Sequence, residues 1–318
     1  MNGVRAARLS AEPIVRPHMD GRMGANINGP SLIRVPDWIE EPLGRYYLYF
    51  AHHKGAYIRL AIADALTGPW RMHTPGALAL GASHFATERP PFESVSEATR
   101  RELAGAAVEQ DYLQPHIASP DVHVDHDRRE IRMYFHGMRE DGEQRTRVAV
   151  STDGVSFDAR PEILGSSYFR VFRHAGWHYA LVMPGELRRS RDGLTGFESG
   201  PVLFRPEMRH SAVRCAGDAL DVFWSRVGDA PERILHSRIR LRGDWTRWRE
   251  EGARVVLEPE HGWEGAGMSV EPSMRGEIDR LVRQLRDPCV YEEDGRTYLL
   301  YCGGGESGIG VAEVTGLD

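Results

Sequence analysis

The sequence predicts an all-β protein built as a single five-bladed β-propeller over residues 1–318, and three observations support this prediction. The same pattern occurs at residues 26–53, 116–137 and 285–305: a polar residue and a proline, an apolar alternating run, a polar turn and an aromatic alternating run. Alternation with period 2, interrupted by turn residues, is typical of paired, half-buried strands. Recurrence at intervals of tens of residues indicates a repeat architecture, and repeated sheets of about four strands form a propeller.

Five repeat units are expected in order along the chain. The first has strands at 31–35, 46–52 and 58–63 and closes with an outer strand that carries Trp70. The second has strands at 121–125, 130–137 and 145–151, followed by a tight Asp-Gly turn. Longer alternating runs predict the remaining units at 168–204, 212–248 and 286–314. We expect Trp70, Trp245 and Trp248 to lie in blade cores.

Two insertions interrupt the repeat. Residues 81–110 contain a segment of helical period at 93–107, and the second insertion covers residues 258–284. The only helices expected lie in these insertions, near Ala98 and Ile278. Long loops in a compact fold are usually functional, so both are expected at the mouth of the central channel.

The composition excludes several classes of function. The formal charge of -6 over 318 residues argues against a protein that binds nucleic acid or a membrane surface. No apolar run is long enough to span a bilayer, and the first 24 residues lack the apolar core of a signal peptide. The three cysteines do not form a disulfide framework. We therefore expect a cytoplasmic protein whose partner is a small molecule; its oligomeric state stays open.

In a propeller, each innermost strand delivers its first polar residue to one central pocket. Asn28, Asp121 and Asp287 are therefore expected to meet there despite their separation in sequence. The carboxyl groups of Asp121 and Asp287 are expected within about 10 Å of each other, the upper range for a catalytic carboxylate pair.

The run RDPCVYEEDGRTYLLYCGGGESGIGVAEV, together with ASPDVHVD and LTGPW, resembles the five-bladed propeller glycoside hydrolases. This group includes the arabinanases and β-xylosidases, the invertases and levansucrases, and the anhydro-galactosidases. The resemblance covers most of the chain and is clearest in the first, second and fifth units. It implies hydrolysis of a small saccharide or glycosylated metabolite, with no cofactor required.

The resemblance also implies three carboxyl groups: a base or nucleophile, a general acid, and an aspartate that tunes the acid. This chain departs from that pattern, because its first blade presents asparagine where the base is expected. Asp287 resembles the missing base moved one blade back around the ring, and Asp121 falls where the tuning aspartate belongs. The acid is expected from the second insertion, at Glu264 or Glu271, with Glu186 as the alternative.

Further residues are candidates for binding. Polar and aromatic side chains near the expected pocket predict contacts with sugar, and they are Asn28, His53, Arg170, His210, Arg286 and Trp263. His116, His123 and His136 are candidate ligands of a divalent ion, calcium or zinc, in the central channel. No local metal-binding signature accompanies them, and histidines that hydrogen-bond sugar or backbone explain the pattern equally well.

Two alternatives to the hydrolase stay open. The same scaffold could carry a lyase, cyclase or isomerase that uses the histidines and aspartates, with or without a metal. It could also be a sugar-binding propeller without catalysis.

Overall fold

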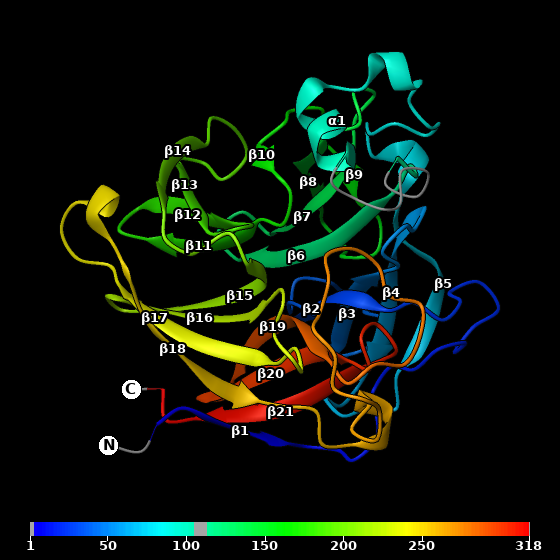
Figure 1. Ribbon diagram of the computed structural model, residues 1–318, viewed down its shortest axis with the longest axis vertical. Helices are drawn as coiled ribbons and strands as arrows, with labels where there is room; N and C mark the ends of the chain where they lie inside the picture. Colours follow the sequence, from blue (N-terminus) through cyan, green and yellow to red (C-terminus); the bar gives the residue numbers. More distant parts are fainter. Residues whose placement is uncertain (1–2, 105–112, 318) are drawn as a thin grey trace.

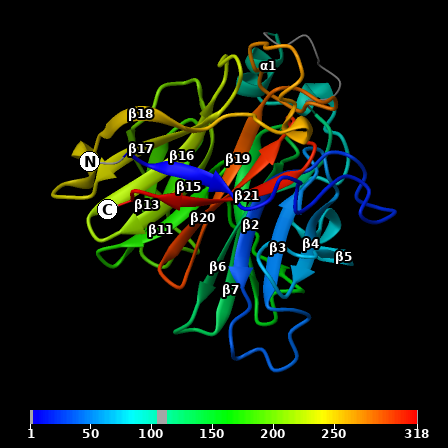
Figure 2. The ribbon, with the colours of Figure 1, turned by 90° about the horizontal axis from the view of Figure 1, so that it is seen from below.

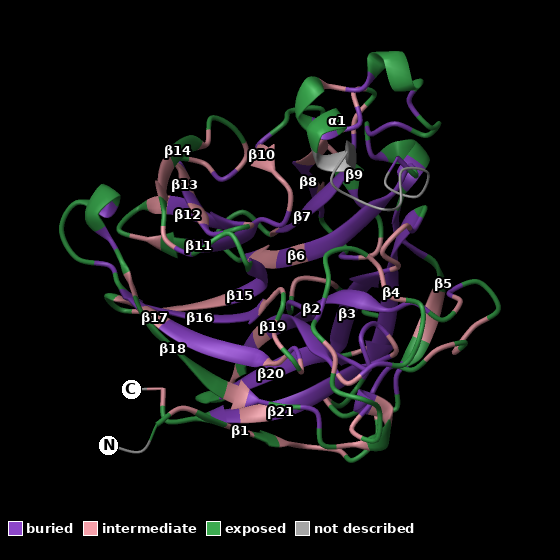
Figure 3. Cartoon of the chain, in the orientation of Figure 1, coloured by how far each residue is buried: buried purple, intermediate pink, exposed green. Residues whose placement is uncertain are grey.

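The computed structural model describes residues 3–104 and 113–317, which form five antiparallel sheets arranged as a ring (Figure 1). The prediction of an all-β, five-bladed β-propeller is confirmed. The innermost strands β2, β6, β11, β15 and β19 lie next to one another around the axis. Burial follows this arrangement, since the inner strands are mostly buried and the exposed residues gather in the peripheral loops (Figure 3).

The blades follow one another along the chain. Blade I contains β2 Asn28–Arg34, β3 Tyr46–Ala51, β4 Tyr57–Ala63 and β5 Arg71–Ala79. Blade II contains β6 Ile117–Asp125, β7 Glu130–Met138 and β8 Gln144–Ser151, with β9 Asp158–Ala159 and β10 Gly165–Ser166 both paired to β8. Blade III contains β11 Arg170–His174, β12 Trp177–Val182, β13 Glu186–Ser190 and β14 Glu198–Val202. Blade IV contains β15 Met208–Ala216, β16 Ala219–Arg226, β17 Ile234–Arg240 and β18 Glu250–Leu257.

Blade V joins the two ends of the chain. Its strands β19 Leu285–Glu293, β20 Arg296–Gly303 and β21 Ile309–Thr315 are completed by β1 Arg5–Arg8, which pairs antiparallel with β21. The two strands lie side by side in both ribbon views (Figures 1 and 2). The sequence pattern did not predict β1, because a four-residue edge strand is too short to show alternation. This pairing closes the ring.

Residues form strands here because both faces of each sheet are covered by neighbouring blades. All six residues of β3 and all seven of β4 are buried. Such continuous burial selects β-branched and aromatic side chains on both faces. Trp70, Trp245 and Trp248 lie in the hydrophobic clusters between sheets, as predicted.

Near the start of each inner strand lies a residue in the left-handed backbone conformation. These residues are Gly29, Ser119, Tyr168, His210 and Asp287, with φ values of 59°, 51°, 63°, 22° and 49°. In four of the blades this residue sits in a register shift between the inner strand and its neighbour. A bulge of this kind bends the strand and re-aims a side chain. Left-handed conformation is costly for residues with a Cβ and often marks functional sites.

Outside the sheets, the described residues contain one α-helix and four short 3-10 turns. These are α1 Glu97–Ala104, η1 Leu80–Ala82, η2 Phe92–Ser94, η3 Trp245–Arg247 and η4 Gly262–Glu264. Helix α1 confirms most of the helix predicted at 93–107, whose last three residues lie outside the described part of the chain. The helix predicted near Ile278 is wrong. Backbone carbonyls of that segment instead accept hydrogen bonds from side chains of the blades. No helix among the described residues has the length and apolar character to cross a membrane.

The closing strand gives a first testable prediction. The Leu9 N–H donates to the Val311 carbonyl, and ladder alternation directs the Ala7 N–H to its partner Glu313. Ala7→Pro removes this donor and leaves a carbonyl unpaired, so the free energy of unfolding should fall by about 1–3 kcal/mol. Ala7→Val keeps the N–H and is the matched control. Equal denaturation midpoints for the two variants would show that closure does not depend on this strand.

Candidate active site

The left-handed residues of the inner strands form a ring of side chains at the N-terminal ends of those strands. A Cβ on Gly29 would lie 2.9 Å from the Ser119 Cα. The rings of Tyr168 and His210 have centroids 5.0 Å apart, and His210 Nδ1 lies 3.2 Å from Asp287 Oδ1. Five positions distant in sequence therefore become neighbours, because each blade places its bulge at the same level.

Asp287 is the chemically unusual member of this ring. Its side chain is 1% exposed, and neither carboxylate oxygen accepts a directed hydrogen bond from a described residue. Burial, followed by the negative charge of Glu306, raises the pKa of Asp287 to about 6, although Arg286, Arg209 and Arg170 oppose the shift. A carboxyl group with this pKa carries a proton at mildly acidic pH and can donate it.

Glu306 is the second buried carboxyl group of the site, and the sequence analysis missed it. It lies in the turn between β20 and β21, accepts from Asn26 Nδ2 at 2.5 Å and Arg286 Nη1 at 3.1 Å, and lies 3.3 Å from His53 Nδ1. Burial opposes its ionisation, but His53 and Arg286 together with the Asn26 hydrogen bond hold the pKa of Glu306 at about 2. The signal that could have found it is a carboxylate directly after three glycines at a strand end.

Arg286 is enclosed by carboxylates. Its guanidinium lies 3.1 Å from both Glu306 and Glu232 and donates to Gln284 at 2.5 Å. These charges outweigh the cost of burial and raise the pKa of Arg286 further above its usual value. The predicted contact of Arg286 with substrate is therefore replaced by an ion network that joins blade V to blade IV.

Neutral imidazoles complete the surroundings of Asp287. The rings of His116 and His136 have centroids 5.7 Å apart, and His136 lies 4.6 Å from Tyr168. Burial lowers the pKa of His116 to about 4 and the pKa values of His136 and His210 well below their usual range. At neutral pH these rings are hydrogen-bonding groups without charge.

The three histidines predicted to bind a metal do not come together. His123 Nε2 contacts Asp121 Oδ2 at 2.8 Å, away from the other two, and His116 Nδ1 contacts the Gln114 carbonyl at 2.7 Å. Among residues 3–104 and 113–317, no group of three His, Cys, Asp or Glu side chains is arranged to hold a metal ion. The predicted set does not fit a metal site, and bound calcium or zinc stays a prediction without a ligand set.

Asp121 does not occupy the position equivalent to Asp287, so the expected meeting of Asn28, Asp121 and Asp287 at one structural point is wrong. In blade II the residue equivalent to Asp287 is Ser119, and Asp121 lies two residues further along β6. Asn28 precedes the left-handed Gly29 of its blade. Because the bulge adds residues to the inner strand, a polar residue beside a proline in the sequence does not show which residue faces the axis.

The position of Asp121 also has a structural role. Its Oδ2 accepts the backbone N–H of Val171 in the next blade at 2.8 Å. In blade I, Ser31 Oγ has the equivalent position and accepts the N–H of Val122 at 2.8 Å. A polar side chain here fastens one inner strand to the next. Burial opposes a charge on Asp121, but His123, Arg170 and the Val171 N–H lower its pKa.

The insertion at 258–284 does not deliver the predicted acid. Glu264 is fully buried away from Asp287, where Arg8 and Tyr301 donate to its carboxylate and its capping box fixes η4. Glu271 pairs with Arg280 at 2.6 Å. Trp263 stacks on Tyr301 rather than forming a sugar platform in the channel. Glu186, the alternative acid, forms an ion pair with Arg188 at 3.0 Å.

The later part of this insertion does cover the Asp287 cluster. Arg209 Nη1 donates to the Met274 carbonyl at 2.7 Å, and Asn26 Nδ2 and Arg286 Nη1 reach carbonyls at 278 and 276, both at 3.5 Å. Lys54 Nζ lies 2.8 Å from Glu277. Residues 274–278 therefore form a cover, attached to blades I, IV and V, over the N-terminal ends of the inner strands.

Solved structures share this fold at low sequence identity. CoXyl43, a β-xylosidase/α-arabinofuranosidase of glycoside hydrolase family 43 from a compost metagenome, matches with a TM-score of 0.58 and 14% identity over 98% of this chain and 94% of its own. A family 43 enzyme of Xanthomonas citri gives 0.59 and 14%, over 97% and 90%. An N-acetylgalactosamine deacetylase of F. plautii gives 0.56 and 10%, over 97% and 95%, so the propeller carries more than one chemistry.

A relative in sequence identifies the family. No protein-family model matches the chain. The uncharacterized protein R118 of Acanthamoeba polyphaga mimivirus is 35% identical over 315 residues, which cover 91% of this chain and 83% of that protein. The fold is that of the five-bladed propeller glycoside hydrolases, and by sequence the chain belongs to the same family as the mimivirus protein R118.

Proposed function

We propose that this protein is a glycoside hydrolase that cleaves a small saccharide or glycosylated metabolite at the Asp287 cluster. One observation carries the proposal: two buried carboxyl groups, Asp287 and Glu306, lie in one cluster with pKa values of about 6 and about 2. Glycoside hydrolysis requires one carboxyl group that holds a proton and one that is ionised.

Asp287 is the proton donor in this proposal. The resemblance to propeller hydrolases implied that Asp287 is the base, but its raised pKa favours the role of acid. In the proposed step, Asp287 gives its proton to the glycosidic oxygen as the bond to the anomeric carbon breaks and a water molecule bonds to that carbon. The proton that this water loses returns to the Asp287 carboxylate. Glu306 stays ionised, and its charge favours both the protonated form of Asp287 and the positive charge that develops on the sugar.

The other side chains of the ring support this assignment. Burial and the charge of Asp287 raise the pKa of Tyr168 to about 12, so its hydroxyl remains a hydrogen-bond donor. Asn28 Oδ1 and His136 Nδ1 are buried without a partner among the described residues. Unpaired buried polar groups are costly unless a ligand or water binds them, and sugar hydroxyl groups match this mixture of donors and acceptors. Structures of the Xanthomonas citri relative hold xylose and xylotriose, which makes small saccharides the first substrates to test.

A second candidate function rests on the contact between His210 and Asp287. A neutral imidazole beside a carboxyl group can exchange a proton with a carbon atom of a sugar, as a lyase or isomerase requires. Turnover in ¹⁸O-labelled water separates the two reactions, because hydrolysis places one labelled oxygen in the products and an isomerase reaction places none by its chemical step.

The role of Asp287 is tested by leaving-group dependence. Asp287→Asn should slow cleavage of an alkyl glycoside or disaccharide by at least ~100-fold, since these leaving groups require protonation. A 2,4-dinitrophenyl glycoside of the same sugar should be affected far less. Asp37→Asn, at an exposed loop carboxylate, is the matched control. Equal losses on both substrates would exclude Asp287 as the general acid.

The pH dependence follows from the same pKa. Because the proton on Asp287 is needed, kcat/KM should fall about tenfold per pH unit above pH 6. Glu306→Gln removes the neighbouring negative charge, so the pKa of Asp287 should drop and the falling limb should move to lower pH. Glu313→Gln, on the outside of blade V, should leave the limb in place.

Glu306→Gln also has a predicted effect on stability. The variant leaves the buried Arg286 with one carboxylate fewer, which should lower the free energy of unfolding by about 3 kcal/mol at neutral pH. Because folding lowers the pKa of Glu306, its stabilising effect is complete above about pH 4.5 and is lost as the pH falls towards 2. Denaturation curves of the two proteins should therefore converge at acidic pH, and a constant difference would contradict the assignment.

A further inference from the structure

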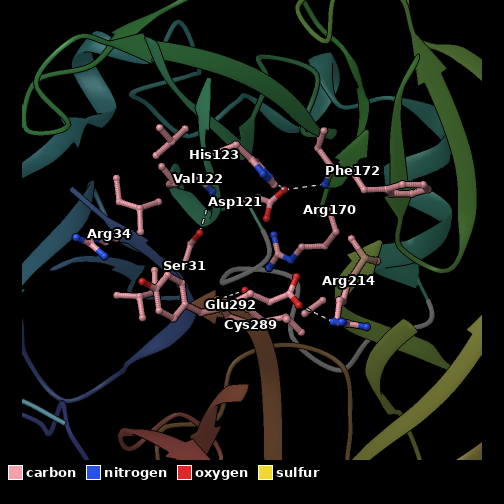
Figure 4. Close-up of a pocket in the computed structure, with 18 of the residues that line it drawn as sticks. Ser31, Arg34, Asp121, Val122, His123, Arg170, Phe172, Arg214, Cys289 and Glu292 are labelled. Atoms are coloured by element: carbon pink, nitrogen blue, oxygen red, sulfur yellow. Dashed lines mark hydrogen bonds and ion pairs between the residues drawn. The ribbon is translucent and has the colours of Figure 1, made fainter. Parts of the chain in front are cut away.

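A pocket opens at the C-terminal ends of the inner strands, and all five blades contribute to it. Its volume is about 560 Å³, which lies within the range of small-molecule sites. Figure 4 shows Asp121, His123, Arg170, Arg214 and Glu292 around this pocket. Asp287, Glu306 and His210 are not among the residues that line it.

Arg170 lies between this pocket and the Asp287 cluster. Its Nε donates to the Ser211 carbonyl of blade IV at 2.7 Å, and its Nη1 donates to the Ser119 carbonyl of blade II at 3.3 Å. The side chain thus crosses the channel and is 4% exposed. Its Nη2 is buried and has no partner among the described residues, and Arg170 is one of the residues that line the pocket. A ligand that reaches the floor of the pocket would therefore meet an unpaired donor.

Asp121 supplies an acceptor beside this donor. Both hydrogen bonds that it accepts from described residues, from His123 and from Val171, end on Oδ2. Its other oxygen, Oδ1, is left for a ligand. In Figure 4 the Asp121 carboxyl group and the Arg170 guanidinium face each other across the floor of the pocket.

The charge of the pocket argues against an anionic ligand. Three arginines and four carboxylates line it, which gives a formal charge of −1 with neutral histidines. Arg214 is paired with Glu292 at 2.7 Å and Arg34 with Glu293 at 3.3 Å. Apart from Asp294 in the turn after β19, the groups left over are the Arg170 donor and the Asp121 acceptor, which lie side by side. Neighbouring hydroxyl groups of a sugar satisfy both, because each hydroxyl can donate and accept.

We propose that this pocket binds a neutral mono- or disaccharide, separately from the Asp287 cluster. Arg170 donates to one hydroxyl oxygen, and Asp121 accepts from the neighbouring hydroxyl group. The binding does not depend on whether Asp287 cleaves a glycoside, because Arg170 lies between the two sites. A propeller with a saccharide site at each end of its channel can keep one sugar bound at the end where no cleavage takes place.

The test uses Asp287→Asn as the parent, so that turnover does not consume the probe, and measures D-xylose and xylobiose by calorimetry. Adding Asp121→Ser removes the free carboxylate oxygen but keeps an acceptor for the Val171 N–H, as Ser31 does for Val122 in blade I. Loss of one hydrogen bond to a charged group should weaken binding at least ~tenfold. Asp127→Ser, in the exposed turn after β6, is the matched control.

A second variant reports on the same pocket without changing Asp121. Val213→Trp adds a large side chain to the wall that blade IV contributes, and it should abolish binding in this pocket. The proposal is overturned if sugar binds the parent but both variants bind it as tightly. It is also overturned if inorganic phosphate displaces the sugar, or if the parent binds no sugar at all. If Asp121→Ser in the otherwise unchanged protein ends turnover while binding persists, Asp121 belongs to the catalytic site instead.

Discussion

The antiparallel pair of β1 and β21 is the constraint on which the rest of the structure depends. It completes blade V with residues from the start of the chain, so the five sheets form a closed ring. A closed ring fixes the direction of all five inner strands and brings their N-terminal ends to one level. Arg8, the last residue of β1, also binds Glu264 and thereby attaches the insertion at 258–284 to the closing strand. The strand that closes the ring is therefore connected to the insertion whose residues 274–278 cover the Asp287 cluster.

The buried charges at the channel show how this ring tunes one acid. Arg286 is held between Glu232 and Glu306, whose negative charges compensate its burial. Asp287 lies beside this network but receives no directed hydrogen bond, so burial and the charge of Glu306 outweigh the attraction of the arginines. Two carboxyl groups in one cluster therefore reach opposite protonation states at mildly acidic pH. The difference arises from their partners and not from their chemical type.

The repeat gives equivalent positions in each blade different tasks. The left-handed position carries Gly29, Ser119, Tyr168, His210 or Asp287, so one backbone feature presents five different side chains to the axis. Two residues further on, Ser31 and Asp121 fasten neighbouring inner strands together. Arg170 crosses between the blades and separates the two ends of the channel. A polar residue near a strand start therefore has one of two roles. At the left-handed position its side chain faces the axis, and two residues further on it connects neighbouring inner strands.

The sequence by itself determined the five blades, the insertion at 258–284 and the place of Asp287 near the start of an inner strand, because alternation and turn residues are local signals. It could not reveal β1, whose partner lies about 300 residues away, or Glu306, whose pKa depends on groups from other blades. The roles expected for Glu264, Glu271 and Trp263 were wrong, because only the folded structure shows that Arg8 and Tyr301 contact Glu264, that Tyr301 stacks on Trp263 and that Arg280 pairs with Glu271. Asp121 was correctly placed on an inner strand but at the wrong level, since a bulge changes which residue faces the axis. Periodicity can be read from the amino-acid sequence, whereas burial and charge pairing arise only when the closed ring brings distant residues together.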